Sequence, residues 1–87
     1  MTMTREAVYS AVDSERRYQD EKWPRLEPLS VVGEITLLRK YLRNFEDHYH
    51  AEDDAFGRDV PMDCLYDLRK MAAILVRAME NSAAISR

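Results

Sequence analysis

Residues 60–81 read VPMDCLYDLRKMAAILVRAMEN, and this stretch decides the fold because its apolar residues recur at helical spacing. The recurring residues follow one another at alternating steps of three and four, and they are Leu65, Leu68, Ala72, Leu75 and Met79. Such a stripe is typical of the helix face that packs against another helix. The stretch therefore predicts a helix over 60–81 with a heptad-like seam.

A second stretch, 31–50, carries the same pattern and supplies the partner for that seam. Its apolar residues at alternating spacing are Ile35, Leu38, Leu42, Phe45 and Tyr49, and Ser30 stands before it as a helix cap. Two such helices joined by a short connection favour an antiparallel hairpin. We therefore expect the helices over 31–50 and 60–81 to pack seam against seam.

Helix breakers are rare and fall between three helical segments. The 87 residues include only two glycines and three prolines, and four of these five lie at two joints, near 24–28 and 57–61. Thr4 is placed to cap a first helix, and Asp59 is placed to cap the third. The sequence therefore predicts one all-α domain over 1–87, with helices over 4–23, 31–50 and 60–81.

Composition excludes several classes of protein. Thirteen basic residues against sixteen acidic ones give a net charge of −3, which lacks the basic field of a nucleic-acid-binding protein. One cysteine cannot form an intrachain disulfide, and one cysteine with two histidines cannot build a structural zinc site. The longest apolar run, 71–76, is too short to cross a membrane. We expect a cytoplasmic protein that binds neither membranes nor nucleic acids.

The segment 60–81 has more apolar surface than one seam requires. A second apolar face is formed by Cys64, Met71, Ile74, Val76 and Ala78. We expect it to be covered by the first helix, by another subunit or by both, and the excess predicts a homo-oligomer that assembles through 60–81. In this reading Cys64 is a small buried hydrophobe.

The first helix changes character halfway along its apolar stripe. The stripe starts with Val8, Ala11 and Val12 and continues with Glu15, Tyr18, Gln19 and Lys22. Burying such polar groups without partners would cost about 1–3 kcal/mol each. They must therefore be paired, solvated or in contact with a ligand.

Two readings of this polar half remain open. In the first, a solvated charged face ends in Trp23, which caps the end of the bundle. In the second, Tyr18 and Trp23 stack on a nucleotide base, while Arg16, Lys22 and Arg69 meet its phosphates. Arg69 equally suits a side chain that lies over an apolar interface.

Carboxylates offer a further possibility, because Mg²⁺ binds to acidic side chains from neighbouring helices. Glu15, Glu34 and Glu80 are the candidates for such a shell, although no Glu-x-x-Glu pair occurs in any of the helices. Asp63 and Asp67 stand one turn apart with a lysine one turn later, which indicates an exposed ladder of ion pairs.

The segment 48–54, HYHAEDD, invites a metal-binding interpretation. His48 and His50 point to different faces of a helix, however, and the acidic residues follow the expected helix end. A solvated helix end that runs into an acidic loop accounts for this segment.

Four short motifs resemble a family of small phage and prophage proteins that are loosely described as MazG-like. The motifs are ERxYQDxKW over 15–23, VGE over 32–34, LRKxAA over 68–73 and ME at 79–80. The resemblance implies a phage origin and a role in the cytoplasm of an infected bacterium. MazG-like enzymes are helical, Mg²⁺-dependent nucleoside triphosphate pyrophosphohydrolases, and of their carboxylate set this sequence keeps only Glu34.

Three functional hypotheses follow. The first is a helical protein that binds a nucleotide or related anion without turnover and without a cofactor, as a counter-defence protein that sequesters its ligand. The second is a Mg²⁺-dependent nucleotide pyrophosphohydrolase with Glu15, Glu34 and Glu80 around the metal. The third is an inhibitor that binds a host enzyme through the charged face of 4–23 and the apolar face of 60–81.

Overall fold

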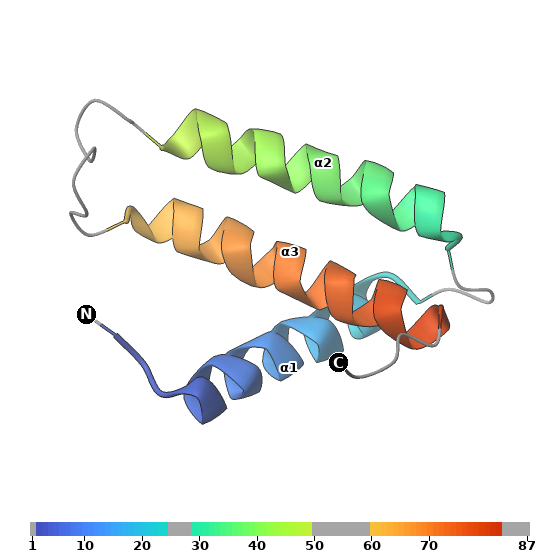
Figure 1. Cartoon of the computed structure of the whole chain (residues 1–87), viewed down its shortest axis with the longest axis horizontal. Coiled ribbons are helices and arrows are strands. Elements are labelled where there is room, and N and C mark those ends of the chain that lie inside the picture. Colours follow the sequence, from blue (N-terminus) through green and yellow to red (C-terminus); the bar gives the residue numbers. More distant parts are fainter. Residues whose placement is uncertain (1, 25–28, 50–59, 83–87) are drawn as a thin grey trace.

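The computed structural model describes residues 2–24, 29–49 and 60–82, and its regular structure there is entirely helical. The elements are α1 (Arg5–Lys22), α2 (Val31–His48) and α3 (Met62–Asn81), shown in Figure 1. The predicted all-α class is confirmed, and the helix ends differ from the expected ones by at most two residues. None of the described helices is long and apolar enough to cross a membrane.

The helix starts follow the expected capping chemistry in two cases out of three. The Thr4 hydroxyl accepts a hydrogen bond from the Ala7 amide, and the Ser30 hydroxyl accepts one from the Gly33 amide, each at 3.1 Å. α3 differs, because Pro61 occupies its N-cap position and no side chain caps it. The predicted cap, Asp59, lies outside the described residues.

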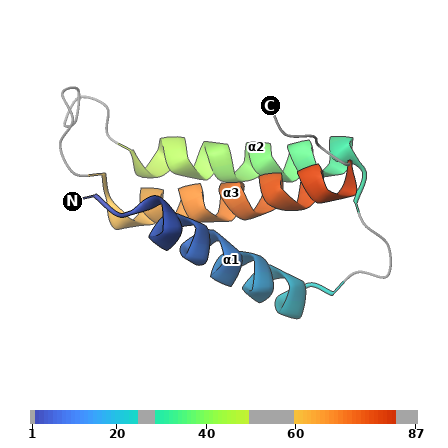
Figure 2. The same ribbon diagram turned by 60° about the horizontal axis from the view of Figure 1, so that its bottom comes forward.

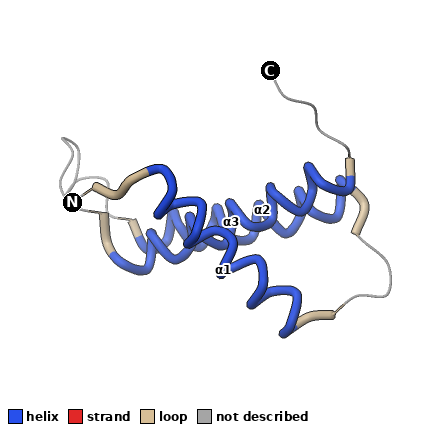
Figure 3. Tube along the Cα trace, turned by 90° about the horizontal axis from the view of Figure 1, so that it is seen from below, coloured by secondary structure: helices blue, strands red, loops and turns tan. Residues whose placement is uncertain are grey.

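α3 is the central helix of the fold. It runs antiparallel to α2 along its length, as predicted, while α1 crosses it on another side and diverges from it towards the end of α1 (Figures 2 and 3). Among the described residues, α1 packs against α3 and not against α2.

α3 is rotated relative to the predicted seam, which is a correction to the sequence analysis. Leu65, Leu68, Leu75 and Met79, expected to face α2, are between 41% and 50% exposed. The core is formed by residues from the other side of the helix, namely Cys64, Ala73, Ile74 and Ala78. The prediction of a buried Cys64 is confirmed, and desolvation, helped by the charges of two nearby aspartates, raises the pKa of its thiol.

Two buried charged side chains of α3, each in contact with a side chain of α2, explain this rotation. Asp67 is buried and its Oδ2 lies 2.7 Å from Nδ1 of His48, while Arg77 forms an ion pair with the buried Glu34. Both α3 residues lie on the side of Ile74, seven residues after Asp67 and three before Arg77. If α3 were turned so that its leucines faced α2, Asp67 and Arg77 would move away from their partners on α2. The expected exposed ladder is therefore wrong at Asp67, which is buried. α2 ends at the exposed His48, as expected for a solvated helix end, and the acidic loop predicted after it lies outside the described residues.

Replacing His48 tests the pair at this end of the hairpin. His48→Ala removes the closest partner of a buried carboxylate, so we expect the free energy of unfolding to fall by about 1–3 kcal/mol in urea titrations. Asp47→Ala, a change at the exposed neighbouring position, is the control and should alter stability by less than about 0.5 kcal/mol. Equal stability of the two variants would contradict a role for the pair in holding α2 on α3.

Candidate ligand-binding pocket

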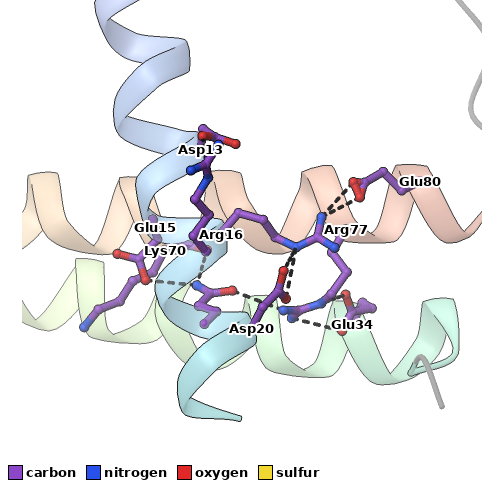
Figure 4. A network of polar contacts seen from close by, with 10 residues as sticks. Asp13, Glu15, Arg16, Asp20, Glu34, Lys70, Arg77 and Glu80 are labelled. Carbon is purple, nitrogen blue, oxygen red and sulfur yellow. Dashed lines mark hydrogen bonds and ion pairs between the residues drawn. The ribbon is translucent and has the colours of Figure 1, made fainter. Parts of the chain in front are cut away.

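A bidentate ion pair joins α2 to α3 in the interior. Nε of Arg77 lies 2.7 Å from Oε2 of Glu34, and Nη2 lies 3.2 Å from Oε1 (Figure 4). Both residues are buried, Glu34 completely. A bidentate guanidinium–carboxylate pair gives each buried charge directed hydrogen bonds, which offset part of the cost of removing it from water.

The same network extends into α1 through Gln19. Oε1 of Gln19 accepts a hydrogen bond from Nη1 of Arg77 at 3.2 Å, and Nε2 donates to Oε2 of Glu15 at 3.2 Å and to the Lys70 carbonyl at 3.4 Å. Oε1 of Glu15 in turn accepts a hydrogen bond from Nε of Arg69 at 2.8 Å. The buried polar residues in the late half of α1 are thus paired, which was one of the outcomes expected from the sequence.

A pocket of about 210 Å³ lies beside this network, between the end of α1 and the middle of α2. Seven residues from all three helices or their ends line it, namely Gln19, Trp23, Leu37, Lys40, Tyr41, Ile74 and Arg77. Among the described residues, the lining includes two cationic residues, two large aromatic rings and no carboxylate. Its volume is below that of a typical drug-sized site, so it suits part of a larger ligand or a small one.

Three ammonium groups lie near the two aromatic rings of the pocket, and one of them, that of Lys40, belongs to a lining residue. Nζ of Lys22 lies 5.0 Å from the centroid of the Trp23 ring, on the α1 side. On the α2 side, Nζ of Lys40 and Nζ of Lys70 lie 5.6 Å and 5.5 Å from the centroid of Tyr41. Such distances permit cation–π contact and place positive charge where a flat ring could stack.

Lys22 is held in its charged form. Its Nζ donates a hydrogen bond to the Tyr18 hydroxyl at 3.0 Å, and this bond is the main reason why the pKa of Lys22 lies above its ordinary value. Attraction to Tyr18 and Tyr41 acts in the same direction. Like any lysine whose pKa is not strongly lowered, Lys22 is an ammonium at neutral pH, and it can contact an anion.

The five binding residues predicted from the sequence are divided among different places. Trp23 lines the pocket and Lys22 lies over its ring. Tyr18 and Arg69 line a separate, more open hollow, and the Tyr18 ring meets Trp23 edge-on at 6.3 Å. Arg16 lines neither, because its guanidinium is bonded to two carboxylates of α1 and α3.

Sequence reasoning missed the contribution of α2 to this pocket. Leu37, Lys40 and Tyr41 share one face of the helix at spacings of three and four, next to the seam that drew attention. The signal available in the sequence was the adjacent pair of Lys40 and Tyr41, a cation and an aromatic ring on that face. It could not be interpreted without knowing that α1 leaves that side of α2 uncovered.

The three carboxylates proposed for Mg²⁺ each pair with a different arginine. Glu15 pairs with Arg69, Glu34 with Arg77, and Glu80 with Arg16 at 2.6 Å; these pairs are separate ion pairs in the network. Within the described ranges, no group of three acidic, histidine or cysteine side chains is arranged to hold a metal ion.

Comparisons with known proteins were made with the whole chain. No family model matches it, and searches of curated proteins and of solved structures find no similar protein. The phage-family resemblance stays a prediction.

A double-mutant cycle tests the ion pair between Glu34 and Arg77, the second of which lines the pocket. Glu34→Leu or Arg77→Met leaves one buried charge without its main partner, and each should lower the free energy of unfolding by about 3–5 kcal/mol. The double variant removes both charges, so its loss should be smaller than the sum by about 0.5–3 kcal/mol. Arg16→Gln, which breaks a pair that includes the half-exposed Glu80, should cost only about 0–1 kcal/mol. Additive losses in urea titrations would contradict the coupling.

Proposed function

We propose that this chain binds a nucleotide, or a related anion that carries a flat ring, in the pocket between α1 and α2. One observation carries the proposal: Trp23 and Tyr41 line a pocket to which the described residues contribute no carboxylate, and three ammonium groups lie 5.0 to 5.6 Å from the centroids of these two rings. The rings come from two helices that do not pack against each other, so a ligand can enter between them.

The pocket offers contacts for both parts of such a ligand, the flat base and the phosphate. A base stacked on an exposed aromatic ring gains about 1–3 kcal/mol whatever its identity, because every base has a π-face. A phosphate close to several ammonium groups gains charge-assisted hydrogen bonds. Arg77 also lines the pocket, but Glu34 balances its charge, and Glu34 and Gln19 occupy its main donors.

Binding without turnover is the favoured form of the proposal. Hydrolysis of a nucleoside triphosphate by a MazG-like mechanism requires carboxylates that are free to hold Mg²⁺. The three candidates are engaged by Arg16, Arg69 and Arg77, and two of them, Glu15 and Glu34, are buried. The role that the phage resemblance suggests for binding without turnover is sequestration of a signalling nucleotide.

Thermal unfolding with a panel of nucleotides tests the proposal. The panel contains mononucleotides, cyclic mono- and dinucleotides and triphosphates, each with and without Mg²⁺, beside adenosine and inorganic phosphate. A ligand at about 100 times its Kd stabilises the folded state by about 2.7 kcal/mol, which raises Tm by several degrees. We expect this shift with at least one nucleotide and a weaker one with adenosine or phosphate alone. No shift with any nucleotide would contradict binding, and Mg²⁺-dependent release of pyrophosphate would contradict the absence of turnover.

Variants of the pocket locate the binding site. Tyr41→Leu and Lys40→Ala each remove one contact of a kind worth about 1–3 kcal/mol, so each should weaken the Kd of the best nucleotide about tenfold, measured by calorimetry. Arg17→Gln is the matched control, since it removes a positive charge from a 77% exposed side chain of α1 that does not line the pocket. Equal weakening by the control would show a general charge effect and contradict the assigned site.

A further inference from the structure

We infer that α2 and α3 of one chain pack face to face with α2 and α3 of a second copy, forming a four-helix dimer. The surface that would be shared consists of six half-exposed apolar side chains, here called the apolar face: Ile35, Leu42, Leu65, Leu68, Leu75 and Met79. These residues are 36% to 50% exposed. The inference is independent of the proposed ligand.

The apolar face retains the spacing of a helix-packing seam. Its members belong to the two stripes whose steps of three and four predict contact with another helix, and the remaining members of those stripes are only partly exposed. Because contacts with α2 fix the rotation of α3, the residues with this spacing face outward from the hairpin instead of towards α2. A second copy presents the same spacing, so a two-fold contact matches seam to seam.

Both stripes border the side of the α2–α3 hairpin that is opposite α1. On α3, contacts with α1 come from Arg69, the Lys70 carbonyl and Glu80, and those with α2 come from Cys64 and Asp67. The leucines of the apolar face occupy the remaining arc of α3.

On α2, the corresponding stripe also lies away from α1. Lys40 lines the pocket between α1 and α2, and at about 100° per residue Leu42 lies on the opposite side of α2 from Lys40. α1 therefore leaves the apolar face of both helices uncovered.

The small core of the described residues indicates why a second copy is needed. The buried apolar side chains are one isoleucine, one cysteine and two alanines, while the six larger ones of the apolar face remain in contact with water. Domains of this length are marginally stable even with a complete core. A partner that covers the apolar face would place the largest aliphatic side chains of α2 and α3 in an interior.

The available area is sufficient for a stable dimer. Six large side chains at this exposure present roughly 500 Å² of apolar surface per chain, or roughly 1,000 Å² for two chains, before the partly exposed residues and the polar rim are added. Specific interfaces begin at about this size, and exposed apolar patches of several hundred Å² commonly mark them. A second copy suits the face better than a different protein because the chain itself supplies matching seams.

Sedimentation equilibrium and the concentration dependence of Tm test the inference. We expect the mass of two chains at micromolar concentration, and a Tm that rises with chain concentration because assembly stabilises only the folded state. The mass of a single chain together with a Tm that does not change with concentration would overturn the dimer. This outcome would leave the proposed ligand pocket, on the other side of α2, unaffected.

Charged substitutions identify the face that assembles. Leu68→Glu and Leu75→Glu should each shift the mass from two chains towards one and remove the concentration dependence of Tm. Tyr9→Glu is the control, since it places the same charge at a 65% exposed ring on α1, and it should leave the dimer intact. A dimer that persists in both leucine variants, or that is lost equally in the control, would overturn the assignment to the apolar face.

Discussion

The ion pair between Glu34 and Arg77 is the interaction on which the remaining structure depends. It lies in the interior, joins α2 to α3 through two hydrogen bonds, and reaches α1 through Gln19. A buried pair of this kind contributes little net stability compared with apolar side chains of the same size. A buried charge that is separated from its partner, however, strongly destabilises the folded state. Its main effect is therefore to select one rotation of α3 over the alternative in which leucines fill the hairpin.

Two consequences of that selection determine the functional surfaces. The leucines of α3 are left on the outside, where they and the stripe of α2 form a face suited to a second copy. α1 is drawn onto α3 by the polar network and away from α2, so a pocket with Trp23 and Tyr41 in its lining stays open. A ligand side and an assembly side on opposite faces of one hairpin allow binding and assembly to be tested separately.

The sequence predicted the elements of the fold better than their rotation. Breakers and caps such as Thr4 and Ser30 act locally, so the helix boundaries could be predicted closely. The side of α3 that faces α2 could not be predicted in this way, because apolar periodicity identified the leucine stripe. The packing is decided instead by Asp67 and Arg77, whose partners on α2 are distant in sequence. The site shows the same limit: Lys22 and Trp23 were predicted from one local string, but Lys40 and Tyr41 join them only through the tertiary arrangement.

The most direct test of the account is the behaviour of the Arg77 Nε–H group in nuclear magnetic resonance spectra of the ¹⁵N-labelled protein. In the structure this group is buried and donates to Glu34 at 2.7 Å. The account predicts a signal that exchanges slowly with water near neutral pH and shows a nuclear Overhauser effect to the side chain of Glu34. Arg17, whose side chain is 77% exposed, provides the fast-exchanging reference. Exchange of Arg77 as fast as that of Arg17, with no contact to Glu34, would contradict the rotation of α3 and the two surfaces that follow from it.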